Sequence, residues 1–123
     1  MTDKDPCFDP SYQCPIQFIV SLLGNKWSIL VLKELFQGSR RTHQLLQALP
    51  GISTKTLTVR LRELESHGLV QRDVYPEIPP RVEYYLTDKG KEIKPVLTAM
   101  YNLGSQWLDQ PSCHCAIEVD TLT

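Results

Sequence analysis

The sequence predicts a mainly α-helical domain that carries one small β-hairpin. Leucine-rich segments with a helical spacing of apolar residues fill the first half of the chain and recur near its end. Between them, residues 69–75 and 82–86 are rich in β-branched and aromatic residues, and a proline-rich segment separates the two runs. The expected order is therefore several helices, a hairpin and a last helix.

Length and composition favour one globular domain. The chain has 123 residues, of which 41% are hydrophobic and 22% charged. We expect an arm over 1–13, a folded domain over 14–109 and a polar, cysteine-containing tail over 110–123. No apolar run approaches the ~18 residues that cross a bilayer, and the acidic start lacks a signal-peptide pattern. The expected location is the cytoplasm.

Residues that favour helix starts and ends, together with apolar content, predict the first two helices. Pro15 follows Cys14 and is favoured at the first position of a helix, which Gly24 then ends. The stretch from Asn25 to Gly38 is apolar on nearly every side, which is typical of a helix that passes through a core.

A tight turn joins the third and fourth predicted helices. Thr42 is expected to cap the third, Pro50-Gly51 forms the turn, Ser53 caps the fourth and Gly68 ends it. The leucines of these helices that are expected to face the core are Leu45, Leu46, Leu49, Leu57, Leu61 and Leu64.

The outward face of the fourth helix is short, polar and cationic. Rotation by ~100° per residue places Lys55, Val59 and Arg62 opposite the leucine stripe, with Thr54 and Thr58 on one flank. A solvated surface face would have the same pattern.

The last part of the chain predicts a projecting hairpin followed by a long helix. Prolines stiffen the tip over 76–81. Thr87 and Asp88 begin the last helix, and Pro95 should kink it. Its apolar stripe is longer than the core requires, so we expect part of it to cover a partner. The stripe consists of Ile93, Val96, Leu97, Met100, Leu103 and Trp107.

Helix, tight turn, helix and hairpin is the order of a winged helix-turn-helix, which inserts one helix into the major groove of DNA. Although the formal net charge is −1, residues 26–94 hold 12 of the 13 basic residues and only 8 of the 14 acidic ones. In this arrangement Arg62 can form a bidentate pair with a guanine, and Ser53 can bind a phosphate. Arg81 can contact the DNA backbone or the minor groove. The candidate DNA contacts are Ser53, Thr54, Lys55, Thr58, Arg62, Arg81 and Arg41.

Several motifs in sequence order resemble the HxlR family of bacterial winged-helix regulators. The resemblance spans about residues 14–108 and implies a homodimeric transcription factor that binds double-stranded DNA and whose N- and C-terminal helices form the dimer interface. It also implies that Cys14 occupies the position at which several members sense oxidants or electrophiles, although the chain has Thr42 where the family usually has an aromatic residue. The matching segments are Cys14-Pro15, LGNKW at 23–27, LPGIS at 49–53, RLREL at 60–64, GLV at 68–70, PPRVEY at 79–84 and the Leu86-Thr87 pair with Gly90.

The four cysteines lie near the termini. A helix N-terminus stabilises a thiolate, so Cys14 is a candidate redox sensor, while a buried and inert thiol is the alternative. Cys113 and Cys115 could supply a resolving thiol. With His114 and Cys7 they could instead bind zinc, but the usual Cys-x2-4-Cys spacing is absent, so no metal is expected.

No enzymatic motif is present, and no cofactor is expected. The leading hypothesis is a dimeric DNA-binding regulator, a repressor, that responds to an oxidant or a small effector. One alternative is a winged-helix protein-interaction module without DNA binding, against which the basic middle of the chain argues. The other is a small thiol oxidoreductase, for which the Cys-x-x-Cys motif is missing.

Overall fold

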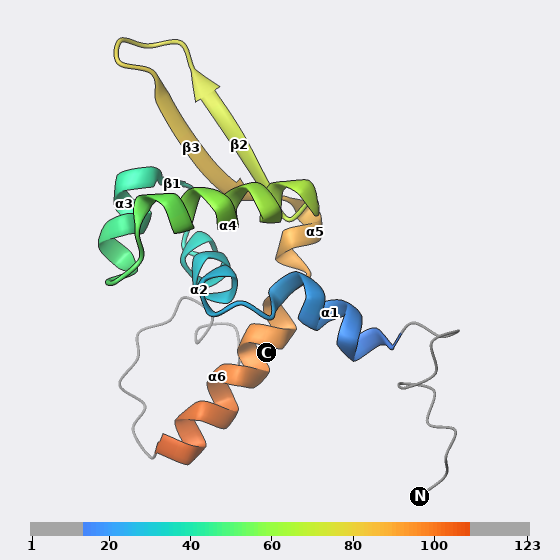
Figure 1. The fold of residues 1–123 in the computed structure, drawn as a ribbon. Coiled ribbons are helices and arrows are strands. Elements are labelled where there is room, and N and C mark those ends of the chain that lie inside the picture. Colours follow the sequence, from blue (N-terminus) through green and yellow to red (C-terminus); the bar gives the residue numbers. More distant parts are fainter. Residues whose placement is uncertain (1–13, 109–123) are drawn as a thin grey trace, which may run out of the picture.

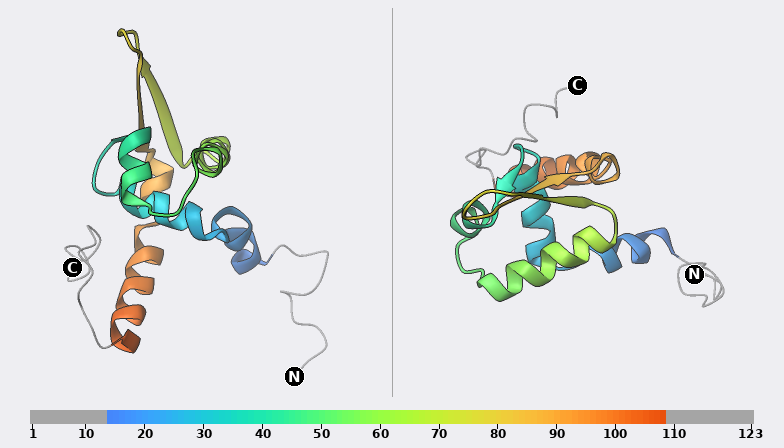
Figure 2. Two further views of the ribbon diagram at one scale, coloured as in Figure 1. Left: turned by 60° about the vertical axis from the view of Figure 1, so that its left-hand side comes forward. Right: turned by 90° about the horizontal axis from the view of Figure 1, so that it is seen from above.

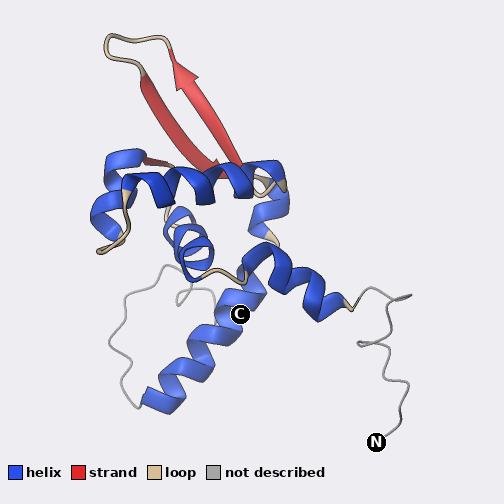
Figure 3. Ribbon diagram, viewed as in Figure 1, coloured by secondary structure: helices blue, strands red, loops and turns tan. Residues whose placement is uncertain are grey.

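The computed structural model describes residues 14–108. In this range the predicted mainly helical class and the winged helix-turn-helix order are confirmed (Figures 1 and 3). The elements in chain order are α1 (Pro15–Leu23), α2 (Lys26–Leu35), β1 (Arg40–Arg41), α3 (Thr42–Ala48), α4 (Thr54–Ser66), β2 (Val70–Tyr75), β3 (Arg81–Leu86), α5 (Asp88–Lys91) and α6 (Lys94–Leu108).

Side-chain caps begin α2, α4 and α5; the caps at Ser53 and Thr87 were predicted, whereas the one at Asn25 was not. The Asn25 Oδ1 accepts a hydrogen bond of 2.8 Å from the Trp27 amide, and the Ser53 Oγ accepts one of 3.0 Å from the Thr56 amide. The prediction that Thr42 caps α3 is wrong. Arg41 holds the cap position, because the chain arrives there as an extended strand, and its amide donates to the Gln44 Oε1 at 2.8 Å.

The sheet has three strands in the order β1-β3-β2, whereas the sequence predicted only a two-stranded hairpin. Strands β2 and β3 pair from Val70 opposite Leu86 to Tyr75 opposite Arg81 and form the wing. The additional strand, β1, places Arg41 opposite Glu83. With two residues it is too short to show an alternating pattern in the sequence.

The predicted last helix is two helices, α5 and α6. Thr87 caps α5 by accepting a hydrogen bond of 3.0 Å from the Gly90 amide. The kink expected at Pro95 is instead a break over residues 92–93. Pro95 lies in the first turn of α6, where a backbone N–H has no partner within the helix, so its absence costs no hydrogen bond. Gly90 has no side chain to collide with the Leu69 carbonyl, which permits α5 to approach the start of β2.

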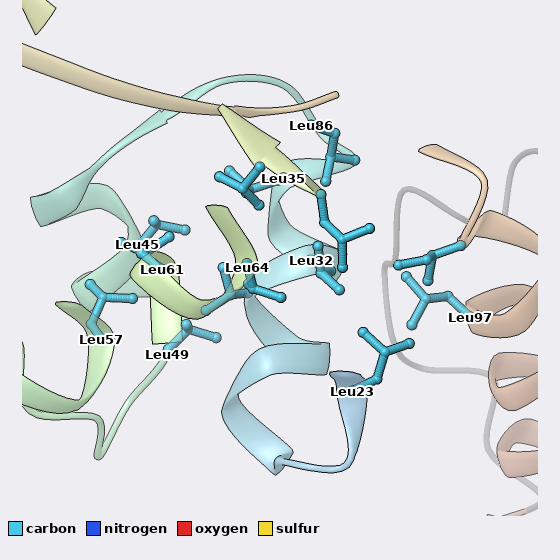
Figure 4. Packing of buried hydrophobic residues seen from close by; sticks show 14 residues of the cluster. Leu23, Leu32, Leu35, Leu45, Leu49, Leu57, Leu61, Leu64, Leu86 and Leu97 are labelled. Carbon is cyan, nitrogen blue, oxygen red and sulfur yellow. The ribbon is translucent and has the colours of Figure 1, made fainter. Parts of the chain in front are cut away.

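Leucines from α2, α3, α4 and β3 point toward one another and form the core (Figure 4). On α4 the predicted stripe is confirmed: Leu57 and Leu64 are fully buried and Leu61 is 2% exposed. Replacing such a leucine by alanine typically costs about 2–5 kcal/mol. The core therefore fixes the rotation of α4 about its own axis, and with it the direction of its outward face.

The wing and α6 extend from opposite sides of the helical body (Figures 1 and 2). Helices α1 and α2 meet at an 80° bend. Within residues 14–108, no single helix is long and apolar enough to cross a membrane, and only the bent pair α1 and α2 meets the length and composition limits together.

Candidate nucleic-acid interface

The outward face of α4 is the centre of the candidate interface. Its residues Lys55, Thr58, Val59 and Arg62 are spaced three and four apart and therefore follow one side of the helix. Lys55, Val59 and Arg62 are exposed, and Thr58 is half-buried. The turn before α4 contains Gly51 with a φ of +94°, a conformation in which a side chain would be strained.

Two cations on this face form no ion pair with any other residue in the described range. Neither Lys55 nor Arg62 makes an ion pair within residues 14–108. By contrast, Arg60 is held 2.6 Å from Glu63 on a neighbouring side of the helix. The positive charge of α4 that is available to a ligand is therefore concentrated on the face that points away from the core.

The hydroxyl groups at the start of α4 are engaged locally. The Ser53 hydroxyl accepts from the Thr56 amide and lies 3.0 Å from the Thr56 hydroxyl. The Thr58 hydroxyl donates to the Thr54 carbonyl at 2.9 Å, whereas the Thr54 side chain is exposed. The Ser53 hydroxyl is therefore already hydrogen-bonded to the first turn of α4, and a phosphate that bound there would have to share it.

Arg81 lies at the start of β3 and is surrounded by acidic and aromatic groups. Its guanidinium is 3.3 Å from the Glu77 carboxylate and 3.4 Å from that of Glu83. It also stacks over Tyr75, 4.2 Å from the ring centroid. Glu83 is shared with Arg41, whose Nε lies 3.8 Å away. Glu77 and Glu83 therefore offset much of the charge of these two candidate DNA contacts.

Arg72 is a wing residue that the sequence reasoning missed. It lies on β2 opposite Tyr84, is exposed, and makes no ion pair within the described range. Its side chain shares a sheet face with Val70 and Val74, since residues two apart in a strand point the same way. The signal was present in the sequence, where a lone arginine stands between two apolar residues of the same face.

The apolar surface expected on the last helix is only partly exposed. Ile93 and Leu97, which the sequence analysis placed in the dimer interface, are buried in the core of the protomer, because the start of α6 packs against the helical body. Val96, Met100, Leu103 and Trp107 are exposed, Trp107 by 76%. Helix α1 adds apolar residues that the sequence analysis did not assign, with Ile16 71% and Val20 57% exposed.

Cys14 is buried at the N-terminal cap of α1, with 4% of its surface exposed. It forms no disulfide with another described residue. Cys113 and Cys115, the predicted resolving thiols, lie outside the described residues, as do Cys7 and His114. Within residues 14–108, no group of three histidine, cysteine or acidic side chains is placed to hold a metal ion.

Comparison with known proteins identifies the family. The HxlR-like helix-turn-helix pattern matches residues 22–112. A relative in Synechocystis sp., named as an HTH-type transcriptional regulator, is 69% identical over 115 residues, which cover 94% of this chain and 85% of the relative.

Two solved structures extend the comparison. The redox regulator HypR in its reduced form is 34% identical, with a TM-score of 0.73 over 76% of this chain and 92% of that one. The reduced form of the transcriptional regulator YodB from Bacillus subtilis is 38% identical, with a TM-score of 0.68 over 76% and 93% of the two chains. The chain belongs to the HxlR-like helix-turn-helix family, whose members are transcriptional regulators and not enzymes.

Proposed function

We propose that this protein is a homodimeric regulator that binds double-stranded DNA at a specific operator and represses transcription there. The observation that carries the proposal is the cationic face of α4, whose Lys55 and Arg62 form no ion pair within residues 14–108 and which the buried leucines on the other side of the helix hold outward. A helix presented in this way fits the major groove. A repressor acts in the compartment that holds its DNA, here the cytoplasm.

Within this proposal the DNA contacts divide into two kinds. Arg62 donates two hydrogen bonds to a guanine, and Thr54, Lys55 and Thr58 contact bases or the adjacent backbone. Ser53 at the start of α4 and Arg41 near the base of the wing bind phosphates. The wing contacts the neighbouring backbone or minor groove through Arg81, joined by Arg72.

The exposed apolar residues of α1 and α6 support a dimer. Two copies related by a two-fold axis would cover this surface in an isologous interface. Each copy then presents one α4, so the operator is an inverted repeat whose half-sites are one or two helical turns apart, about 10 bp per turn. Val96, Met100, Leu103 and Trp107 form the α6 part of the interface.

We further propose that oxidation of Cys14 alters DNA affinity. A peroxide converts the thiolate to a sulfenic acid, and a second thiol then displaces water to form a disulfide. Because α1 carries part of the proposed dimer surface, a new bond at Cys14 would change the separation of the two α4 helices. The similarity to HypR, solved in reduced and oxidised forms, and to YodB, solved reduced and after diamide treatment, supports this role. Cys113 and Cys115 are the candidate resolving thiols.

The experiment that tests DNA reading is selection from random duplexes, followed by anisotropy titrations at several salt concentrations. We expect an inverted-repeat consensus, and an affinity that falls steeply as salt rises because each phosphate contact releases counterions. Absence of binding to any duplex, by a protein shown to be folded and dimeric, would reject the proposed function.

A further inference from the structure

Val59 is an exposed apolar residue in the middle of the cationic face of α4. Its surface is 41% exposed. Lys55 lies four residues before it and Arg62 three residues after it, so the three side chains share one side of the helix. The core uses the opposite side of α4, where the buried leucines lie, and Val59 is not part of that cluster.

Helix formation does not account for a valine at this position. A β-branched side chain loses rotamer freedom in a helix, so valine is a poorer helix former than alanine, lysine or glutamine. A polar residue would also suit the solvent better than an isopropyl group. Val59 is therefore suited to a contact outside the protomer, on the same side as Lys55 and Arg62.

The major groove offers one apolar group to such a side chain, the C5-methyl group of thymine. We propose that Val59 packs against a thymine methyl group and sets a preference for a T·A pair near the base read by Arg62. This inference rests on the proposed function. Three helical residues rise ~4.5 Å and one base pair rises ~3.4 Å, so the thymine lies within about two base pairs of the guanine that Arg62 contacts.

The test replaces single thymines in the selected operator by deoxyuridine, which removes the methyl group and keeps the base pair. We expect one such position per half-site to weaken binding of the wild type by about fourfold, the effect of exposing one buried methyl group. The Val59→Ala variant should bind the thymine and uracil duplexes equally, with the affinity that the wild type has for the uracil duplex. Val59→Ile should keep the discrimination.

Two controls separate this contact from a general loss of binding. Val74→Ala removes another exposed valine, on the wing, and should keep the discrimination between thymine and uracil. Thermal melting should show Val59→Ala to be no less stable than the wild type, because the valine is outside the core.

Three results would overturn the inference. In the first, the wild type binds every uracil duplex within twofold of the thymine duplex while Arg62→Ala still weakens binding; DNA reading then stands and the methyl contact does not. In the second, the sensitive thymine remains sensitive in Val59→Ala, so another residue contacts it. In the third, the folded wild type binds no duplex at all, and the proposed function fails together with the inference.

Discussion

The guanidinium of Arg81 lies 3.3 Å from the carboxylate of Glu77, across the turn at the tip of the wing. Glu77 is 52% exposed at its side chain, so removing its charge leaves the core untouched. The pair holds the arginine in place and at the same time reduces the positive charge that the wing offers to DNA. Glu77 therefore opposes binding to phosphates in the proposed complex.

Replacing Glu77 by glutamine should strengthen binding to all duplexes. The substitution keeps the size of the side chain and leaves the charge of Arg81 less compensated. We expect the slope of log affinity against log salt to become steeper by up to about one. Titrations at several salt concentrations measure this. Glu92→Gln makes the same change in net charge at the junction of α5 and α6, so equal effects of the two substitutions would contradict a local role of Glu77.

Arg72→Ala should weaken binding to specific and unrelated duplexes alike. Arg72 is exposed on the wing and has no partner within residues 14–108, so its full charge is available to a phosphate. The salt slope should become shallower by roughly one. Arg81→Ala should reduce the slope less, because Glu77 and Glu83 already offset its charge. An unchanged slope in Arg72→Ala would remove this residue from the interface.

Arg62→Ala should reduce the free energy of binding to the selected operator by about 1–3 kcal/mol and should relax the base preference at one base pair in each half-site. The physical reason is the loss of a bidentate contact to a guanine. Selection with the variant, followed by titration, shows both effects. Lys55→Ala is the comparison. If Lys55 contacts a phosphate, this substitution should weaken binding without changing the consensus. Unaltered affinity and consensus in Arg62→Ala would refute reading by α4.

Trp107→Asp should convert the proposed dimer into a monomer. Trp107 is 76% exposed, so the substitution does not disturb the protomer core, but it places a charge in the proposed interface. Sedimentation at micromolar concentration measures the assembly. Gln106→Asp introduces the same charge at the neighbouring exposed residue without removing apolar surface, and a smaller effect is expected. A fully dimeric Trp107→Asp variant would show that the interface lies elsewhere.

Diamide or peroxide should change the operator affinity of the wild type, reversibly with dithiothreitol, and should leave Cys14→Ser unaffected. The substitution removes the thiol that the oxidant attacks and keeps a small polar cap residue at the start of α1. A Cys113→Ser, Cys115→Ser double variant tests the tail as the source of the second thiol. Equal sensitivity of the wild type and Cys14→Ser would leave Cys14 as a packed cap.

Local pattern was enough to predict the parts of the fold that depend on neighbours in the chain. The buried stripe of α4, its cap at Ser53 and the two wing strands follow from spacing, capping and alternation over a few residues. The outward direction of Lys55 and Arg62 follows in turn, because the leucines on one side of a helix determine which residues face outward.

Contacts between segments that are distant in the sequence determined the features of the fold and of the site that local pattern did not predict. Strand β1 exists because Arg40 and Arg41 meet β3 more than 40 positions later, a pairing that two residues cannot signal. Ile93 lies at the break between α5 and α6 and Leu97 in the first turn of α6, and both are buried because this part of the chain packs against other segments of the core. The compensation of Arg81 by Glu77 and Glu83 depends on the shape of the wing. Sequence spacing determines which face of an element is apolar, but only the packed chain determines which charges meet and which apolar residues stay exposed.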